Sequence, residues 1–431
     1  MALSVSVVLV TQARAVTLLR DPDIEHALKQ LAAPVLKSAG LNASRVSILM
    51  IDDRNLNAFV VDRDNIFIHS GLLLKMTSPQ MIQGVLAHEA AHIANGHLVR
   101  RPVNLRNART AAGLGLVLAA AAGAASGNAQ AAAGVALGVQ SSASRLFFAH
   151  TRAEESSADN AAVRYMVRAG LDPTGMVDVM DIFRGQEALS VGRQDPYART
   201  HPLSADRLRV LRRLTATYEG KIKPTNSDLY WFARAKGKLS AFQRSPKWTL
   251  ARAGESGFAD VGHMRKAIAW HRQSNLRKAL ASMDRAIALR PNDAYYHELR
   301  GQILMEHRQF AAATAAYARA VNAAPNHPLI LGSYGRALMA QNQTAKVLQV
   351  LEKARARDGR DARVMRDLAV AYAKSGNNGM ASLLTAERYA LVGRLKDAEI
   401  HAKRASGLLP RGSGGWQRAQ DVLSAAKAAK R

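Results

Sequence analysis

The sequence has no cysteine in its 431 residues. A disulfide framework and thiolate ligation of a metal ion are therefore both excluded, and any metal ion has to be held by nitrogen and oxygen atoms. Aromatic residues make up only 5% of the chain. No basic run carries the interleaved aromatic side chains that stack on nucleic-acid bases, so we expect no nucleic-acid partner.

Acidic residues are also few, with 33 Asp and Glu against 60 Lys and Arg, which gives a formal net charge of +27. Most of the excess lies late in the chain, because residues 231–431 hold 35 basic and 14 acidic residues, a difference of 21. We interpret this excess as a solvated, arginine-rich surface. Docking of that surface on an anionic membrane is the alternative.

No uncharged stretch is long and apolar enough to predict a membrane span. Residues 110–144 lack charge, but Ser126–Asn128 divides them into apolar pieces of about 15 and 11 residues, short of the ~20 that cross a bilayer. Ala and Gly dominate both pieces. We predict a helical hairpin of small residues, with shallow contact with a membrane surface as the alternative.

The chain begins with a short apolar run that ends in Ala13–Ala15, a pattern typical of a secretory signal cleaved after Ala15. No positive charge precedes the run, which departs from the usual signal, so a buried strand or helix is the alternative. We predict that residues 1–15 are a signal peptide and that the protein is exported.

A helix and then a small β-sheet are predicted between residues 16 and 75. Residues 21–40 have apolar side chains at helical spacing, whereas residues 45–73 contain short β-branched runs separated by polar turns. The next helix is bounded by Ser78, which is placed to cap its first turn, and by Gly96, which is placed to stop it.

That helix carries the sequence HEAAH. Positions four apart lie on one face of a helix, so His88 and His92 direct their imidazoles at one cation, and Glu89 stands beside it. Two histidine ligands and a glutamate base for a bound water are the arrangement of zinc hydrolases, and a His-bearing helix without metal is the alternative. His97 lies off this face, and we expect a surface histidine or one that supports a ligand ring.

A catalytic zinc held by two histidines needs a third protein ligand. The sequence ESSAD, in a helix predicted after the hairpin, places Glu155 and Asp159 on one face, with Glu154 pointing elsewhere. We expect Glu155 to ligate the metal and Asp159 to accept the ring proton of His88 or His92. An acidic pair that only complements the helix dipole is the alternative.

The carboxy-terminal part of the chain repeats with a period of 34 residues. Small and bulky residues recur at this spacing: Ala286, Ala320 and Ala354; Pro291 and Pro325; Gly301 and Gly335; Trp270, Leu304, Leu338 and Tyr372. The pattern resembles the tetratricopeptide repeat, a helix-turn-helix unit that stacks into a superhelix. We predict the array over residues 260–412, with an irregular or inserted helix in its last part. A linker at 226–259 precedes it and a basic tail at 413–431 follows.

HEAAH and ESSAD, with the strand IFIHSGLL before them and THPLSADRL after them, resemble the gluzincin peptidases of the CAAX prenyl protease superfamily. The repeat array and the export signal narrow the resemblance to the beta-barrel assembly-enhancing protease group of the Gram-negative periplasm. The resemblance implies a mainly α fold with a small β-sheet, in which an HExxH gluzincin protease domain at residues 16–225 precedes an α-solenoid of tetratricopeptide repeats.

The resemblance also implies roles for single residues. His88, His92 and Glu155 match the ligands of Zn²⁺, and Glu89 matches the catalytic base. His201 matches a histidine that approaches the metal from a loop, where it stabilises the reaction intermediate or occupies the fourth metal position as a latch.

Arg207 matches an arginine near the substrate oxyanion. We further expect the strand at Asn65, Ile66, Phe67 and Ile68 to hold an extended substrate by strand addition. The implied substrates are unfolded or misassembled envelope proteins, with the outer-membrane assembly machinery as a partner. The alternative is a latched protease that acts mainly as a periplasmic chaperone or scaffold.

Overall fold

The computed structural model describes residues 17–98, 151–189 and 193–429. The predicted signal peptide and the predicted hairpin at 110–144 lie outside the described residues. Within them, a small sheet is surrounded by many helices, which confirms the predicted fold class. Across the described parts of the chain, no helix combines the length and the apolar character needed to cross a bilayer.

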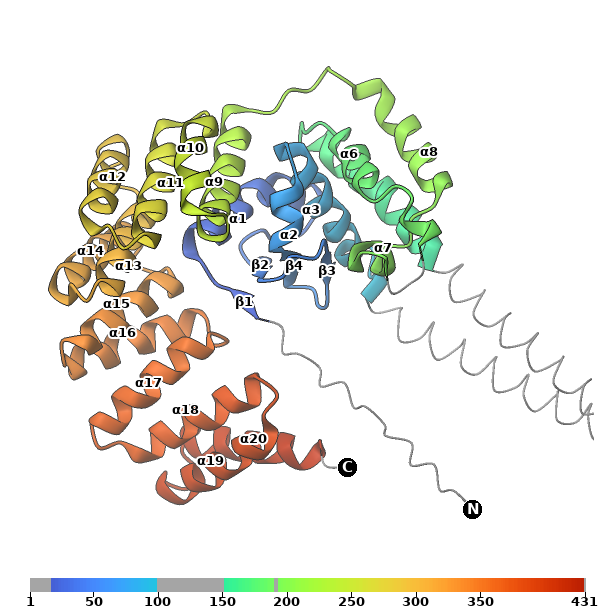
Figure 1. The fold of residues 1–431 in the computed structure, drawn as a ribbon. Coiled ribbons are helices and arrows are strands. Elements are labelled where there is room, and N and C mark those ends of the chain that lie inside the picture. Colours follow the sequence, from blue (N-terminus) through green and yellow to red (C-terminus); the bar gives the residue numbers. More distant parts are fainter. Residues whose placement is uncertain (1–16, 99–150, 190–192, 430–431) are drawn as a thin grey trace, which may run out of the picture. The chain divides into compact units, whose positions relative to one another are not determined.

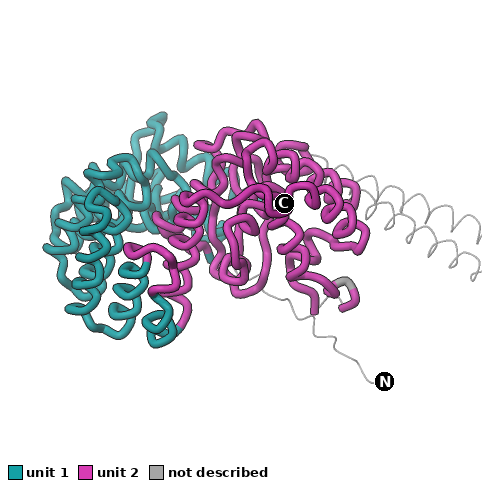
Figure 2. Tube along the Cα trace, turned by 90° about the horizontal axis from the view of Figure 1, so that it is seen from above, with its two compact units in different colours: residues 1–17, 245–253, 262–431 teal, residues 18–244, 254–261 magenta. Residues whose placement is uncertain are grey.

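The described chain forms two compact units, which are coloured separately in Figure 2. The amino-terminal unit contains residues 18–244 and 254–261, and the carboxy-terminal unit contains residues 245–253 and 262–431.

The sheet of the amino-terminal unit has four strands in the order β1-β2-β4-β3. β2 and β4 run parallel, with Ser47 paired to Asn65 and Ile51 to His69, whereas β1 and β3 are antiparallel to their neighbours. β3 is therefore an edge strand and β4 an interior strand. The strands are β1 (Leu18–Leu19), β2 (Ser47–Ile51), β3 (Ala58–Val60) and β4 (Asn65–His69).

The position of β4 corrects one prediction. The strand expected to hold substrate, Asn65–Ile68, pairs with β2 on one side and with β3 on the other, so no free backbone edge remains for an added strand. Ile66 and Ile68 are fully buried, as befits the apolar run of an interior strand. Strand addition next to β4 is excluded, and the edge on this side belongs to β3.

Helices α1 and α3 pack on the sheet and on each other. α3 (Pro79–Ala94) is buried on almost every side, because its sequence is mainly apolar apart from Gln80, Gln83 and the HEAAH segment. Pro79 occupies its first turn, and Gly96, at φ 68°, follows its end. Ser78 stands at the N-cap as predicted, but its side chain makes no capping hydrogen bond.

The other helices of this unit are shown in Figure 1. Residues 151–168 are helical. The remaining elements are α1 (Pro22–Ser38), α2 (Ser70–Lys75), α6 (Gly175–Ile182), η1 (Gln186–Ala188), α7 (Pro196–Thr200), α8 (Ala205–Thr215), η3 (Ala216–Tyr218), α9 (Asn226–Gln243) and η4 (Ala253–Ser256).

Residues 226–259 were expected to form a linker, but the structure has the long helix α9 there, followed by α10 (Pro246–Arg252). α9 packs on α1 through fully buried cations. Arg234 Nε donates to Asp23 Oδ1 at 2.6 Å, and Lys238 Nζ donates to Asp21 Oδ1 at 2.9 Å. The charges of Arg234 and Lys238 are therefore neutralised inside the unit.

α9 is also tied to α3. Asp228 forms a capping box with Thr225 at the start of α9, and it accepts a hydrogen bond of 2.7 Å from Gln83 Nε2 on α3. Both Gln83 and Asp228 are buried. This contact ties α3 to the start of α9.

The carboxy-terminal unit consists of paired helices: α11 (Ala259–Arg272), α12 (Leu276–Leu289), α13 (Ala294–Glu306), α14 (Phe310–Ala323), α15 (Pro328–Ala340), α16 (Thr344–Arg357), α17 (Ala362–Lys374), α18 (Asn378–Leu391), α19 (Leu395–Leu408) and α20 (Gly414–Ala428). The recurrence of glycine at Gly301 and Gly335 has a steric cause. A Cβ atom on Gly335 would lie 2.3 Å from a carbon atom of Leu351. Small residues at this position let the two helices of a pair approach closely.

An irregular or inserted helix is predicted in the last part of the array. α17 to α20 continue the alternation of the earlier pairs, so the described residues 362–428 contain no inserted helix, whereas α18 is irregular in the residues that it buries. The predicted basic tail also contains α20, which packs on α18 and α19 and buries Ala419, Val422 and Ala426. A three- to four-residue apolar spacing among basic residues marks a helix with one packed face.

Candidate metal centre

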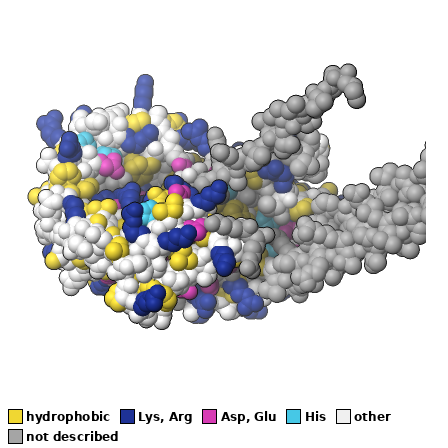
Figure 3. All heavy atoms as spheres, turned by 90° about the horizontal axis from the view of Figure 1, so that it is seen from below, with side chains coloured by type: hydrophobic (Ala, Val, Ile, Leu, Met, Phe, Trp, Pro, Cys, Tyr) yellow, Lys and Arg dark blue, Asp and Glu magenta, His cyan; other side chains and the backbone are white. Residues whose placement is uncertain are grey.

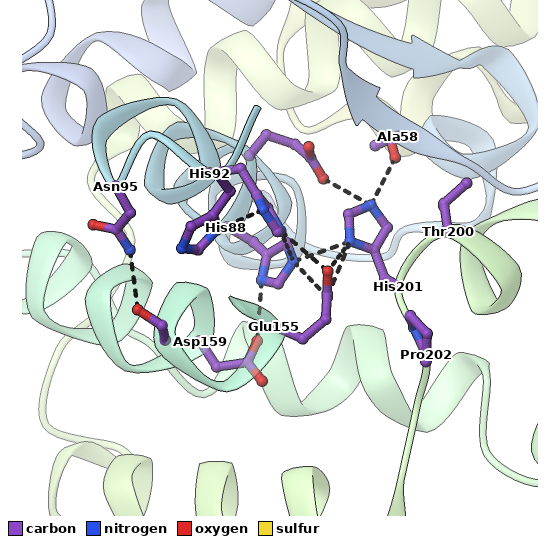
Figure 4. A network of polar contacts seen from close by, with 12 residues as sticks. Ala58, His88, His92, Asn95, Glu155, Asp159, Thr200, His201 and Pro202 are labelled. Carbon is purple, nitrogen blue, oxygen red and sulfur yellow. Dashed lines mark hydrogen bonds and ion pairs between the residues drawn. The ribbon is translucent and has the colours of Figure 1, made fainter. Parts of the chain in front are cut away.

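Four buried side chains from three segments converge in the amino-terminal unit (Figure 4). α3 supplies His88 and His92, the helix at residues 151–168 supplies Glu155, and the turn after α7 supplies His201. One ligand atom from each lies within 4.8 Å of all the others. Each of the four residues is at most 3% exposed, so the site is shielded from bulk water.

The distances between these ligand atoms suit a small cation. His88 Nε2 lies 3.1 Å from His92 Nε2, 3.2 Å from His201 Nδ1 and 3.2 Å from Glu155 Oε2. His201 Nδ1 lies 3.1 Å from Glu155 Oε2, and His92 Nε2 lies 3.3 Å from Glu155 Oε1. Ligands at about 2.0 Å from a tetrahedral ion are about 3.3 Å apart. The donor set therefore fits one metal ion.

The outer nitrogens of the rings fix which nitrogen faces the centre. His88 Nδ1 donates to Asp159 Oδ1 at 3.0 Å, and His201 Nε2 donates to the Ala58 carbonyl at 3.2 Å. These bonds leave the lone pairs of His88 Nε2 and His201 Nδ1 directed at the carboxylate of Glu155 and at each other. Lone pairs that converge in this way are satisfied by a proton or by a metal cation between them.

His97 was expected at the surface or in support of a ligand ring, and the structure places it behind His92. Its Nδ1 atom lies 2.9 Å from His92 Nδ1, and only 2% of its surface is exposed. A proton on His92 Nδ1 that is shared with His97 leaves His92 Nε2 free to ligate.

Arg207, which is predicted to lie near the substrate oxyanion, lies next to the candidate ligand Glu155. Its guanidinium donates to both carboxylate oxygens of Asp159, at 2.9 and 3.0 Å, and Nη1 lies 3.2 Å from Glu155 Oε2. The side chain is 6% exposed. In this geometry Arg207 orients the two carboxylates that contact the histidines, and α8 is thereby held against the helix at 151–168.

Glu89 is completely buried, and its Oε1 lies 3.4 Å from His201 Nε2. The side chain therefore stands on the His201 side of the cluster, opposite Asp159. Glu154 does not belong to the group of ligand atoms. His69, at the end of β4, also lies outside that group, and its Nδ1 is 3.5 Å from Asp53 Oδ2. His150 lies outside the described residues.

The electrostatics show how strongly the site favours positive charge. Burial lowers the pKa of His88, but hydrogen bonds with Asp159 and Glu155 outweigh it and raise the pKa to about 10. Burial lowers the pKa of His92 to about 3. Burial acts to raise the pKa of Glu155, yet the charge of His201 and three histidine hydrogen bonds hold it well below its usual range. A proton on His88 and a metal ion compete for the same lone pair.

The α7 segment also covers the sheet edge beside this cluster. Tyr197 N donates to the Leu56 carbonyl at 3.1 Å, Thr200 Oγ1 donates to Asn57 Oδ1 at 3.2 Å, and His201 reaches the Ala58 carbonyl. One short helix and the turn after it therefore bring His201 to the other candidate ligands and also contact Leu56, Asn57 and Ala58, where β3 begins.

Comparison with known families agrees with this site. Residues 19–215 match peptidase family M48, and residues 304–366 match the tetratricopeptide repeat. The chain thus carries an M48 peptidase domain followed by tetratricopeptide repeats, which confirms the resemblance drawn from HEAAH, ESSAD and the 34-residue period.

Curated relatives match the chain over different lengths. The chain is 24% identical over 408 residues to the beta-barrel assembly-enhancing protease of Escherichia coli (strain K12), which covers 92% of this chain and 81% of the relative. A Vibrio cholerae protein assigned the same name by inference is 28% identical over 246 residues, 52% of this chain and 50% of the relative. Protease HtpX of Shewanella baltica (strain OS185) is 38% identical over 77 residues, 17% of this chain and 26% of the relative.

Two solved structures each match less than half of the chain, with low TM-scores. YrrB, described as a TPR protein with an unusual peptide-binding site, is 17% identical, covers 44% of this chain and 96% of its own, and has a TM-score of 0.33. A MamA structure is 16% identical, covers 38% of this chain and 97% of its own, and has a TM-score of 0.32.

Proposed function

We propose that the protein is a zinc-dependent endopeptidase that cleaves unfolded or misassembled envelope proteins, which its repeats recruit. The observation that carries this proposal is the convergence of His88, His92 and Glu155 around one point, with the buried carboxylate of Glu89 beside it. Nitrogen and oxygen ligands at these spacings favour Zn²⁺, and a carboxylate outside the ligand set is what peptide hydrolysis needs as a base.

The chain's own groups divide the work of hydrolysis. A zinc ion held by His88, His92 and Glu155 would supply Lewis acidity that polarises the scissile carbonyl and activates a water molecule. Glu89 would accept a proton from the attacking water and deliver it to the leaving amine. Asp159 and Arg207 hold the ligands in place from behind, and the burial of the cluster strengthens each of these interactions.

The substrate backbone would add to β3, the edge strand beside the site. A peptide bound there as a further strand would place its carbonyl next to His201 and Glu89, and an unfolded chain suits this mode because its backbone groups are free. The α7 segment holds this edge in the described conformation, so α7 has to move before a substrate strand can pair.

A second function is favoured by the same contact. With His201 Nδ1 in the fourth position, the centre is closed to water, and the protein would act mainly as a chaperone or scaffold through its repeats. Removal of residues 260–431 separates the two functions. Loss of client binding with intact hydrolysis of short peptides supports the protease, whereas loss of client protection with no hydrolysis in either form supports the scaffold.

The names of the relatives extend the proposal to a cellular setting. Because the E. coli relative is a beta-barrel assembly-enhancing protease, we propose that this protein acts in the periplasm on barrel proteins of the outer membrane and contacts their assembly machinery. Peripheral contact of the basic carboxy-terminal unit with an anionic membrane is part of the same proposal. On the face shown in Figure 3, Lys and Arg side chains cover more of the surface than Asp and Glu do.

Substitution of the base tests the proposal directly. We expect Glu89→Gln to retain the metal, because Glu89 is not in the ligand set, and to abolish cleavage of casein used as an unfolded substrate. Cleavage by Glu89→Gln at the rate of the unaltered protein would refute the assigned role.

A further inference from the structure

The fourth helix pair of the carboxy-terminal unit departs from the pattern that the first three share. On the second helix of each pair, Met283, Tyr317 and Leu351 recur at the 34-residue period, and all three are buried. The residue at this position on α18 is Thr385, which is only half-buried. A bulky apolar contact made in three pairs is therefore missing from the fourth.

A second position of the repeat changes in the same helix. Ala286, Ala320 and Ala354 are each at most 1% exposed, and the corresponding residue of α18 is Arg388, which is half-buried. α18 turns a different face inward and buries Gly379, Ser382, Leu383, Leu384 and Ala386. The break in the repeat is therefore accommodated by a changed packing face, with the array intact.

Thr385 and Arg388, the two changed residues, both line a hollow of about 620 Å³ between α17, α18 and α19, which we call the Arg388 pocket. Each of the three helices contributes one arginine to it: Arg366, Arg388 and Arg404. Val370 and Leu408, 42% and 55% exposed, give it an apolar wall. In the part of the chain that the structure describes, no acidic side chain lines the pocket.

Carboxylates nearby neutralise only part of the positive charge of the pocket, because Arg366 is paired whereas Arg388 and Arg404 have no ion pair among the described residues. Asp367 is shared by Arg366 and Arg336 at 2.8 Å each, and Asp397 is bonded to Arg394 at 2.8 Å. His401, which also lines the pocket, has its pKa lowered by burial and then by the charge of Arg404, as expected beside excess positive charge.

We propose that the Arg388 pocket binds an acidic segment of a recruited protein, in which Glu or Asp carboxylates meet the three guanidinium groups and a neighbouring apolar side chain contacts Val370 and Leu408. Such a pocket would give the repeats a specific binding site for their proposed recruiting role. The proposal rests on that proposed function only for the identity of the recruited protein. Guanidinium groups recognise carboxylates through paired hydrogen bonds. A concave pocket with an adjoining apolar wall suits the side chains of a peptide, whereas a flat lipid surface calls for protruding cations.

The experiment measures binding of a fluorescent peptide to the full-length protein. The probe is a 12-residue peptide of alternating Glu and Leu with blocked ends, and the matched peptide has Gln in place of Glu. We expect Arg388→Ala and Arg404→Ala each to weaken binding of the Glu peptide by about tenfold, as for the loss of a charged hydrogen-bond pair. Arg388→Ala restores the alanine of the other pairs, so the variant is expected to fold.

Arg319→Ala is the control, because Arg319 is an exposed arginine of α14 outside the pocket, and we expect its binding to be unchanged. Equal binding by Arg388→Ala, or equal affinity for the Glu and Gln peptides, would overturn the proposal. So would vesicles of anionic phospholipid that bind in an Arg388-dependent way while the Glu peptide does not. Binding is measured with a chelator present, so that it does not depend on peptidase activity. Failure of the proposed peptide binding can then be distinguished from failure of the proposed peptidase function.

Discussion

The Nδ1 atom of His97 lies 2.9 Å from Nδ1 of His92, a residue whose other ring nitrogen faces Glu155. His97 itself contributes no atom to the group of ligand atoms. Its contact fixes the ring orientation and the tautomer of His92 from behind, in the way that Asp159 fixes those of His88.

Replacement of His97 tests this relationship. We expect His97→Ala to weaken the affinity for zinc by about 10- to 100-fold, the usual effect of losing a hydrogen-bond partner of a ligand. His97→Asn, which keeps a polar partner, should recover part of the loss. Competition with a chelating dye measures the affinity, and His307→Ala, a histidine lost from the other unit, is the control. Unchanged affinity in His97→Ala would show that His92 needs no partner.

His201 is expected to restrain the protease. In His201→Ala the three remaining ligands keep the ion, and the fourth position and the Ala58 carbonyl are both released. We therefore expect retained zinc and faster cleavage of casein, measured by release of acid-soluble peptides. A loss of cleavage with zinc retained would assign His201 to the stabilisation of the reaction intermediate instead.

The buried pair between α9 and α1 holds the amino-terminal unit together. Arg234 and Asp23 are 0% and 1% exposed, so Arg234→Ala leaves a buried carboxylate without its closest partner. We expect the free energy of unfolding of this unit to fall by roughly 3–5 kcal/mol. Denaturant unfolding followed by circular dichroism gives the value.

Arg209→Ala is the matched control for Arg234→Ala, because Arg209 pairs with Asp206 at 2.9 Å on the surface, where the two side chains are 68% and 79% exposed. An exposed pair contributes about 0–1 kcal/mol. Equal, small losses in both variants would mean that α9 contributes little to this unit and that residues 226–243 behave as the predicted linker after all.

The turns inside the helix pairs offer a stabilising change. Ser274, Arg308, Asn342 and Gly376 recur at the 34-residue period, and all have φ between 56° and 80°, where a side chain is strained. We expect Arg308→Gly to raise the free energy of unfolding of the array by roughly 1 kcal/mol. Arg319→Gly, inside α14, should lower it by about 1 kcal/mol. A destabilised Arg308→Gly would show that the Arg308 side chain makes a contact worth more than the strain.

Local spacing explains which parts of the candidate site were predictable. The four-residue spacing places His88 and His92 on one face of α3, and the same spacing places Glu155 and Asp159 on one face of their helix. The structure brings the two faces together. The predicted capping role of Ser78 was less secure, because a cap also depends on the rotamer of one hydroxyl group.

The relations that sequence left open are those set by tertiary pairing. The sequence of an apolar strand is similar at the edge and in the interior of a sheet. The sequence therefore predicts β4 as the substrate strand, although β3 pairs with it and forms the edge. The sequence suggests that Arg234 and Lys238 are exposed, because their partners Asp23 and Asp21 lie far away along the chain, at the start of α1. α20 has few large apolar residues, and its small buried side chains gave too weak a pattern to predict packing.

The most direct measurement is the metal content of the purified protein, taken with casein cleavage before and after treatment with a chelator. We predict about one zinc ion per chain, cleavage that stops when the ion is removed and returns when zinc is added back, and loss of the ion in Glu155→Ala. A protein that purifies without metal, or that cleaves casein equally well with chelator present, would contradict the account.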